Sequence, residues 1–466
     1  MVQKIGMTTP IKFTFINDII DEVSQLFPYN YIHIGGDECL KDRWKVCPFC
    51  QMRMKNEDLK NVKQLQSYFV KRVEKIVNAH GKKIIGWDEI LEGGIAPGAT
   101  IMSWENEKGG IIAADHNHEV IMCPQKWLYL DHYQGSEKVE PVALKGLVTL
   151  KDVYSYNPVP GKIQTYKQNY IIGTQSNIWS EYLYTAEKVE YIAYPRLIAF
   201  AEVAWTIRKN KEFANFIYRL NNQFPRLDYR HVNYHIPLPE GPANTEVFTD
   251  TINLLFSNSR NVKMTYTLDG TEPGIFSARY EKPIHLNEST TVKIRTVLET
   301  SEMSQVRIVK CIKQSYTPGI LNNTKPGLVL RSTQGKFNSA NDLDTVQIWS
   351  ESLIYDLKTR FNYLIPSAAI ITGYIEIQNS GIYYFSTNVE QFWLNGNLLI
   401  DNYGEVKNHS RNDASAALSK GKHEIKMIFL NNIVGGRPSS INGIRIYYRK
   451  KPENVIKLID PSMISH

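Results

Sequence analysis

Five short apolar segments punctuate the first 235 residues of the chain, and polar or aromatic side chains follow each of them. Stretches in which apolar residues recur at helical spacing lie around these segments, at 10–27, 59–76 and 196–205. Strands that alternate with helices pair in parallel, and the groups that follow them gather at one end of a β/α barrel. The pattern therefore predicts an α/β region with parallel strands at residues 31–34, 84–87, 101–104, 120–123 and 171–175.

The rhythm changes to short strands and turns after residues 235–239. Apolar and polar residues alternate at 262–268, and Asp269 and Gly270 then supply a tight turn. A length of 466 residues suggests about three domains. We therefore predict a first domain at 1–235 and two all-β domains at 236–316 and 320–455.

Composition excludes several classes of protein. The formal net charge is only +7, and no basic stretch with interleaved aromatic residues points to nucleic acid. No apolar run reaches the ~18–20 residues of a membrane span, and the first ten residues lack the apolar segment of a signal peptide. Aromatic residues make up 11% of the chain, which suits both strand-rich cores and flat sugar-binding surfaces.

Cys39, Cys47 and Cys50 lie close together in the sequence, and the last two form a CxxC pair. No second CxxC and no nearby HxxxH completes a zinc ligand set. The spacing therefore favours a structural role, either a local disulfide or plain packing, over a metal site. We expect no metal and no cofactor.

Asp37 and Glu38 are adjacent carboxylates that follow the first strand directly after two glycines. They can be a helix cap with a solvated neighbour, or they can mark the mouth of a barrel active site. Carboxylates beside aromatic rings are typical of sugar sites, where rings stack on C–H faces and polar groups bind hydroxyls. Further candidates at the same ends of later strands are Trp87, Trp104, Tyr129, Asp131, Trp179 and Glu181. Together these groups favour a carbohydrate site.

Six motifs in the first 205 residues occur in the order of one enzyme family, at 33–38, 86–89, 103–105, 129–131, 175–181 and 194–196. They resemble the signature of glycoside hydrolase family 20, the β-N-acetylhexosaminidases. The resemblance implies hydrolysis of terminal non-reducing N-acetyl-hexosamine residues, so the expected partners are N-acetyl-hexosamine-terminated glycans. It also implies a retaining, substrate-assisted mechanism, in which the acetamido oxygen attacks the anomeric carbon and an oxazolinium intermediate forms.

The resemblance also implies a role for each candidate residue. Glu38 would protonate the glycosidic oxygen and then activate water, and Asp37 would hold the acetamido N–H. Tyr129 would hydrogen-bond the acetamido carbonyl oxygen. The remaining candidates would surround the sugar: Trp87, Trp104 and Trp179 as walls, and Asp131 and Glu181 as ligands of its hydroxyl groups.

The later regions have likenesses of their own. Residues 266–273 resemble the C-terminal β-sandwich module of chitobiases and hexosaminidases. Residues 381–385, 393–396 and 420–423 resemble a PA14-type β-barrel, which is often a carbohydrate-binding accessory. Val389-Glu390 stands near the place where such modules carry paired calcium-binding aspartates, so no calcium is expected there. A carbohydrate contact and a ligand-free structural domain both remain open.

The α/β region departs from the family because it offers five strands where a complete barrel has eight. Family members carry the Asp-Glu pair after the fourth strand, whereas here it follows the first. We therefore predict an N-terminally truncated barrel, made of strands four to eight. A catalytically inactive remnant that at most binds carbohydrate is the alternative function. The resemblance implies a periplasmic or secreted parent protein, and it leaves the choice between GlcNAc and GalNAc open.

Overall fold

The computed structural model describes residues 10–135, 137, 139–258, 262–320, 323–337, 339–357, 366–402, 414–431, 444–451, 453 and 455–466. The chain divides into two compact units, one formed by the residues up to 134 with 142–235 and the other by 135–141 with 236–466. The first nine residues, on which the prediction of no signal peptide rests, lie outside the described residues. No described helix is long and apolar enough to cross a membrane.

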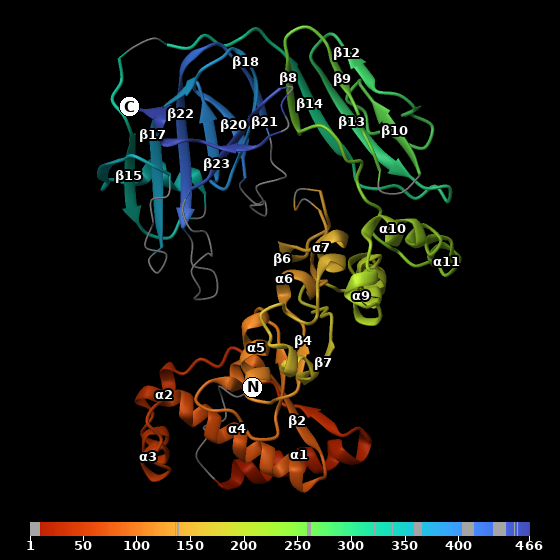
Figure 1. Ribbon diagram of the computed structural model, residues 1–466, viewed down its shortest axis with the longest axis vertical. Coiled ribbons are helices and arrows are strands. Elements are labelled where there is room, and N and C mark those ends of the chain that lie inside the picture. The colour runs from red at the N-terminus through yellow and green to blue at the C-terminus, as the bar shows by residue number, and fades with distance from the viewer. Residues whose placement is uncertain are drawn as a thin grey trace. The chain divides into compact units, whose positions relative to one another are not determined.

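The first unit contains a sheet of five parallel strands in the order β1-β2-β3-β4-β7 (Figure 1). Neighbouring strands pair with Ile32 opposite Ile84 and with Ile101 opposite Val120. Because all five strands run in the same direction, their carboxyl ends meet at one edge of the sheet. The strands fall in the five predicted segments: β1 (Tyr31–His33), β2 (Lys83–Trp87), β3 (Thr100–Ser103), β4 (Val120–Met122) and β7 (Ile171–Thr174).

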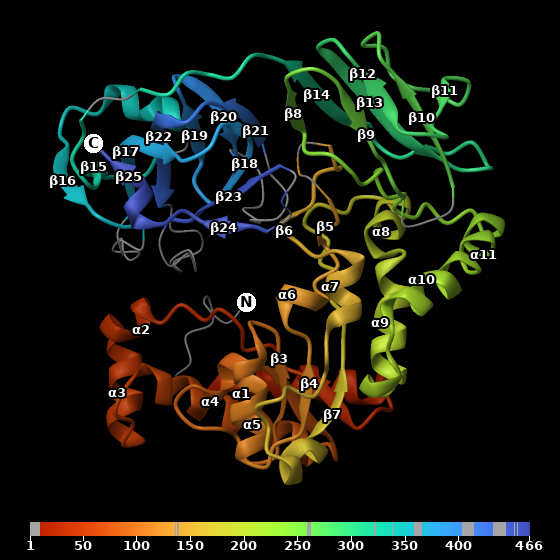
Figure 2. The same ribbon diagram turned by 45° about the horizontal axis from the view of Figure 1, so that its top comes forward.

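Helix α4 (Val62–Ala79) shows how the connecting segments become helical. Asn61 caps it by accepting hydrogen bonds from the backbone N–H groups of Lys63 at 3.0 Å and Gln64 at 3.1 Å. Leu65 and Val73 belong to its buried face, and the helix contacts β2 and α1 (Figure 2). The other helices are α1 (Pro10–Leu26), α2 (Asp42–Val46), α3 (Pro48–Asn56), α5 (Glu107–Asp115), α6 (Gln125–Leu128), α7 (Leu150–Ser155), α8 (Ala186–Ala193), α9 (Arg196–Trp205), α10 (Phe213–Asn221) and α11 (Phe224–Tyr229).

Short elements complete the first unit. They are the 3-10 helices η1 (Asp88–Leu91), η2 (Thr165–Tyr170) and η3 (Arg208–Asn210), and the parallel strand pair β5 (His132–Tyr133) and β6 (Leu144–Leu147). The centre of the parallel sheet is buried, since every residue of β3 is inaccessible. Its edges are more open: Tyr31 on β1 and Ile172 on β7 are both exposed.

The second unit consists mainly of strands. One sheet has the order β11-β10-β13-β14-β8-β21-β18-β23-β24, and another has the order β16-β15-β17-β22-β19-β20 with β25 paired to β17. Its strands are β8 (Thr245–Phe248), β9 (Ile252–Leu254), β10 (Lys263–Thr267), β11 (Ala278–Arg279), β12 (Ile284–Leu286), β13 (Thr290–Val297), β14 (Arg307–Lys313), β15 (Leu328–Gln334), β16 (Ser350–Ile354), β17 (Ser367–Ile377), β18 (Gly381–Thr387), β19 (Gln391–Leu394), β20 (Asn397–Asp401), β21 (Ala414–Leu418), β22 (Gly421–Asn431), β23 (Ile446–Lys450), β24 (Lys457–Leu458) and β25 (Ile464–Ser465).

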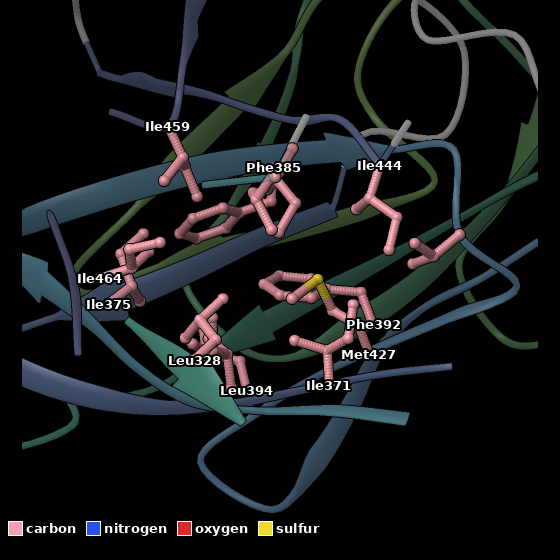
Figure 3. Close-up of a cluster of buried hydrophobic side chains, with 14 of the residues drawn as sticks. Leu328, Ile371, Ile375, Phe385, Phe392, Leu394, Met427, Ile444, Ile459 and Ile464 are labelled. Carbon is pink, nitrogen blue, oxygen red and sulfur yellow. The ribbon is translucent and has the colours of Figure 1, made fainter. Parts of the chain in front are cut away.

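One large cluster of buried apolar side chains joins the two large sheets (Figure 3). Strand β22 contributes Ile425, Met427 and Phe429 to this cluster. Its alternate residues Ile428 and Leu430 belong to a second cluster on the other face of the strand. Successive apolar residues of β22 therefore alternate between two buried clusters, as expected of a strand that is covered on both faces.

Strand β8 makes the nine-stranded sheet continuous, because it pairs in parallel with β14 on one side and with β21 on the other. The Val247 N–H donates to Ser415 Oγ at 2.6 Å. Glu246 is buried and accepts a hydrogen bond from the Tyr384 hydroxyl at 2.5 Å. Lys451 Nζ lies 3.8 Å from the same carboxylate. The carboxylate buried in this sheet is therefore paired.

Candidate active site

The predicted site residues lie in the segments at the carboxyl ends of the parallel strands. They are Asp37 and Glu38 after β1, Trp87 at the end of β2, Trp104 after β3, Tyr129 and Asp131 after β4, and Trp179 and Glu181 after β7. Since parallel strands bring these ends to one edge, the topology alone places all eight residues on the same side of the sheet.

Gly35 and Gly36 form the turn that carries Asp37 and Glu38. Both glycines have positive φ angles, of 74° and 104°, which favour glycine over any other residue. A Cβ atom on Gly36 would lie only 2.4 Å from Cγ2 of the buried Ile90. The backbone therefore approaches the first 3-10 helix closely at this point, and the two carboxylates follow directly.

The two carboxylates are exposed. Glu38 has a φ angle of 45°, in the left-handed region that non-glycine residues rarely adopt. Its backbone N–H donates to Glu89 Oε1 at 3.3 Å. Burial lowers the pKa of His33 at the end of β1, and the neighbouring Asp37 carboxylate acts in the opposite direction. Because Asp37 and Glu38 are exposed, both acidic side chains are accessible to a substrate.

Trp104 and Tyr129 form the aromatic part of the site next to Glu89. Their rings stack at a centroid distance of 6.0 Å and an interplanar angle of 25°. The Trp104 Nε1–H donates to Glu89 Oε2 at 2.9 Å. Burial raises the pKa of Tyr129, against the effect of a hydrogen bond with the Trp179 side chain. The Tyr129 hydroxyl therefore keeps its proton at neutral pH and can donate it to an acceptor on a ligand.

Asp131 is held by the backbone of Trp179. Its Oδ2 accepts a hydrogen bond from the Trp179 N–H at 3.2 Å, while its buried Oδ1 has no partner among the described residues. Burial raises the pKa of Asp131 to about 6, and the charge of the exposed Glu181 acts in the same direction. Trp179 is 42% exposed, and its ring lies 6.0 Å from the Trp87 ring. A carboxylate oxygen without a partner is an acceptor that can bind a hydroxyl group of a sugar.

Asp88, Glu89 and Arg196 also support the site, although no role was predicted for them from the sequence. Asp88 accepts hydrogen bonds from Ser103 Oγ at 3.2 Å and from the Trp104 N–H at 3.4 Å. Burial, assisted by the charge of Glu89, raises the pKa of Asp88 to about 7. Asp88 and Glu89 directly follow Trp87 in the motif at 86–89, and this position was the signal for them in the sequence.

Arg196 at the start of α9 is fully buried. Its guanidinium donates to the carbonyl oxygens of His132 at 3.1 Å and Val148 at 2.6 Å, and it also reaches the carbonyls of Leu130 and Ile192. Three of these four carbonyls lie in the segment 130–148, which begins beside Tyr129 and contains Asp131. The signal for these contacts in the sequence was an arginine at the start of a mainly apolar helix.

None of the five cysteines, all of which are among the described residues, forms a disulfide. Cys39, Cys47 and Cys50 belong to one apolar cluster with Trp44 and Leu65. Of the two structural roles expected for them, the structure shows packing and no disulfide. Within the part of the chain that the structure describes, no group of three or more His, Cys, Asp and Glu side chains is arranged to hold a metal ion.

The fold and the site define a modular protein, with a TIM-barrel-like α/β region that bears carboxylates and aromatic rings, followed by β-rich domains. Comparison with known families identifies the first region. Residues 2–208 match the model "Glycosyl hydrolase family 20, catalytic domain", so this region is similar to the catalytic domain of that family. Residues 252–308 match the model "Fn3 associated", and residues 324–454 match the PA14 domain, which confirms the second likeness noted in the sequence.

Known relatives agree with this assignment. The chain is 47% identical over 466 residues to a "Beta-hexosaminidase" of Porphyromonas gingivalis, covering 97% of this chain and 60% of the relative. It is 33% identical over 197 residues to a "Beta-hexosaminidase" of Vibrio furnissii, covering 41% of this chain and 32% of the relative. The solved GH20 exo-β-N-acetylglucosaminidase of Vibrio harveyi has a TM-score of 0.45, 28% identity, and coverage of 50% of this chain and 37% of that chain. The chain thus spans 60% or less of the length of these relatives.

Proposed function

We propose that this site hydrolyses terminal non-reducing N-acetyl-hexosamine residues from β-N-acetylhexosaminides. The observation that carries the proposal is the arrangement of Glu38, Trp104 and Tyr129 around one carboxylate. Glu89 accepts hydrogen bonds from Glu38 and Trp104, and Trp104 stacks on Tyr129. An exposed acid, an indole wall and a protonated phenol therefore belong to one connected set of contacts.

The chemistry we propose is retaining and substrate-assisted. Asp37 and Glu38 are sequence neighbours on one turn, so they are poorly placed to flank a glycosidic bond as separate acid and nucleophile. Glu38 gives its proton to the glycosidic oxygen as the bond to the anomeric carbon breaks. The substrate's acetamido oxygen attacks the same carbon from the opposite face and forms the oxazolinium ring. Glu38 then takes a proton from water, which opens the ring, and the original anomeric configuration returns.

The remaining residues bind the sugar and stabilise the charge that develops. Asp37 accepts a hydrogen bond from the acetamido N–H and stabilises the positive charge of the oxazolinium ring. Tyr129 donates its hydroxyl proton to the acetamido oxygen, in keeping with its raised pKa. Asp131 offers its unpartnered Oδ1 to a sugar hydroxyl, and Glu181 binds a second one. The walls are Trp87, Trp104 and Trp179.

We also propose that residues 1–235 correspond to strands four to eight of a (β/α)8 barrel, followed by β-rich domains at 236–316 and 320–455. Two observations support this proposal. The Asp-Glu pair follows the first strand of the parallel sheet, and β1 and β7 pair on one side only among the described residues. The PA14 domain is then an accessory that contacts glycans, and the parent protein acts in the periplasm or outside the cell.

The test is hydrolysis of 4-nitrophenyl N-acetyl-β-glucosaminide and the corresponding galactosaminide by the full chain. A second preparation adds, as a separate polypeptide, the part of the Porphyromonas gingivalis relative that this chain does not cover. General acid–base catalysis contributes roughly 10²- to 10⁴-fold to rate, so Glu38→Gln should lower kcat by about that factor. Glu22→Gln on the exposed face of α1 is the control and should keep the rate of the parent chain.

The outcomes separate the parts of the proposal. Hydrolysis by the chain alone supports the site and contradicts the need for further strands. Hydrolysis only with the added polypeptide supports both the site and the barrel assignment. Absence of hydrolysis in both preparations, or full activity of Glu38→Gln, contradicts the proposed function. NMR of the first-formed product distinguishes retention from inversion at the anomeric carbon.

A further inference from the structure

Glu89 occupies an unusual place between two strands that do not pair with each other. It lies in η1, directly after β2, and β2 separates β1 from β3 in the sheet. One carboxylate oxygen, Oε1, accepts the Glu38 N–H that follows β1, at 3.3 Å. The other oxygen, Oε2, accepts the Trp104 Nε1–H that follows β3, at 2.9 Å. A single carboxylate therefore ties together two residues of the proposed site.

Each hydrogen bond fixes a feature that the site needs. Glu38 stands at a φ angle of 45°, where a non-glycine residue persists only if its surroundings hold it. The bond to its N–H restrains that turn and hence the direction of the acid side chain. The bond to the indole fixes the Trp104 ring, and that ring in turn stacks on Tyr129.

The chemistry of this position requires two acceptors. Both groups that face Glu89 are N–H donors with no acceptor capacity, and each is bound by a different oxygen. A glutamine would present one carbonyl oxygen and one NH₂ group. One of the two donors would then face another donor, so the isosteric amide cannot keep both contacts.

We propose that Glu89 is the positioning residue that holds the acid Glu38 and the Trp104–Tyr129 pair in register for the reaction. It touches neither substrate nor reacting atoms; it acts through Glu38 and Trp104. The inference rests on the proposed function, because it assigns Glu89 a part in that same hydrolysis. Its expected signature is a loss that falls on the acid-catalysed step.

The test compares two substrates that depend differently on the acid. The 2,4-dinitrophenyl N-acetyl-β-glucosaminide has a leaving group that departs without protonation, whereas the phenyl glycoside needs a proton from Glu38. Glu89→Gln should lower kcat/KM for the phenyl glycoside at least about 10-fold more than for the dinitrophenyl glycoside, as expected when general acid catalysis is impaired. The measurements use whichever full-chain preparation hydrolyses the substrates.

Glu119→Gln is a matched control. Glu119 also links β1 to β3, because its Oε2 accepts hydrogen bonds from the Tyr31 hydroxyl at 3.1 Å and from Thr100 Oγ1 at 3.2 Å. Those contacts lie at the amino ends of the two strands, where no site residue stands. Glu119→Gln should therefore affect thermal stability at most, and its kcat/KM ratio between the two glycosides should match that of the parent chain.

The outcomes are distinguishable. A selective loss in Glu89→Gln with a normal ratio in Glu119→Gln supports the inference. Equal losses on both glycosides, or the same ratio in both variants, overturn it while leaving the proposed function intact. Absence of hydrolysis by the parent chain in either preparation overturns the proposed function and the inference with it. Should Glu89→Gln fail to fold, Glu89→Asp keeps both acceptor atoms on a shorter arm, and the same selective loss, smaller in size, is expected of it.

Discussion

The two units of the chain differ in how they treat the edges of their sheets and their buried polar groups. The nine-stranded sheet ends in β11 and β24, which have only two residues each. Such short edge strands offer little backbone for unwanted pairing. The parallel sheet instead ends in β1 and β7, which expose Tyr31 and Ile172. The nine-stranded sheet therefore tapers at both ends, whereas the parallel sheet carries exposed apolar side chains on its edge strands.

Three carboxyl groups away from the surface also differ between the units. In the β-rich unit, the buried Glu246 is paired with Tyr384 and lies near Lys451. In the α/β unit, Asp88 is half-buried with a raised pKa, and the buried Asp131 keeps one oxygen without a partner. Groups held at a cost in stability cluster at functional sites. These carboxyl groups differ in the expected direction: the one in the β-rich sheet is paired, whereas the two at the proposed site have raised pKa values.

Phe392→Ala should have the largest effect on stability. Phe392 is fully buried in the cluster that joins the two large sheets, and removal of a buried phenylalanine ring typically costs about 3–5 kcal/mol of the free energy of unfolding. Denaturant unfolding measures the loss, and Tyr355→Ala at an exposed position is the control, expected within about 0.5 kcal/mol. Turnover per folded molecule should not change. A fall in turnover per folded molecule would contradict the expectation that this cluster serves stability while the α/β unit carries the hydrolysis.

Asp88→Asn should flatten the pH dependence of stability in the α/β unit. The folded pKa of about 7 lies above the ordinary value of 3.8, so the folded state holds a proton that the unfolded state has lost between these values. Stability therefore falls as pH rises from about 4 to 7, by at most about 4 kcal/mol for three units at ~1.4 kcal/mol each. The variant should lose less stability than the parent chain between pH 4 and 7.

Unfolding followed by tryptophan fluorescence suits this measurement, since six of the eight tryptophans, among them Trp87, lie in residues 1–235. Asp131, with its pKa of about 6, adds a slope of the same sign, so the dependence should shrink without vanishing. Asp42→Asn is the control, because Asp42 is exposed and its hydrogen bond to Lys45 lowers its pKa. A slope unchanged by Asp88→Asn would mean that this carboxyl does not titrate near neutrality.

The sequence predicted the parts of the fold that depend on local pattern. Short apolar runs became the parallel strands, because such runs are buried on both faces in a β/α sheet. The helix expected at 196–205 has those bounds in the structure, as α9. The candidate residues were found in the same way, since each follows a predicted strand and parallel topology brings those positions to one edge. The roles assigned to them stay proposals.

Long-range contacts escaped the sequence. The bond from the Glu38 N–H to Glu89 spans 51 positions, and the bonds from Arg196 to the segment 130–148 span between 48 and 66. No periodicity reports such pairs, because each depends on how separate strands come together. Strand β8 is a further case, because nothing in its local sequence shows that β14 and β21 would pair on its two sides.

Tyr384→Phe tests the buried pair that the second unit keeps satisfied. The substitution leaves the ring in place and removes the hydroxyl that donates to Glu246 at 2.5 Å. A buried acceptor that loses its donor costs about 1–3 kcal/mol, more than the net value of the bond itself. Denaturant unfolding should show this loss, whereas Tyr355→Phe at the exposed position should cost almost nothing. A neutral Tyr384→Phe would mean that the Ala243 N–H, which donates to Glu246 Oε1 at 2.8 Å, and Lys451 satisfy the carboxylate without the hydroxyl.

Ile172→Lys should change the free energy of unfolding least, by no more than about 0.5 kcal/mol. It nevertheless tests most directly whether an edge strand behaves differently from a strand that is paired on both sides. Ile172 is 48% exposed on β7, which pairs on one side only among the described strands, and a charge on such an edge opposes pairing between chains. Ile308→Lys is the matched control, since Ile308 is 41% exposed on β14, whose two sides are occupied by β13 and β8. Sedimentation velocity should show less self-association for Ile172→Lys and no change for Ile308→Lys. Equal behaviour of the two variants would mean that exposure of an isoleucine, rather than an open strand edge, governs association.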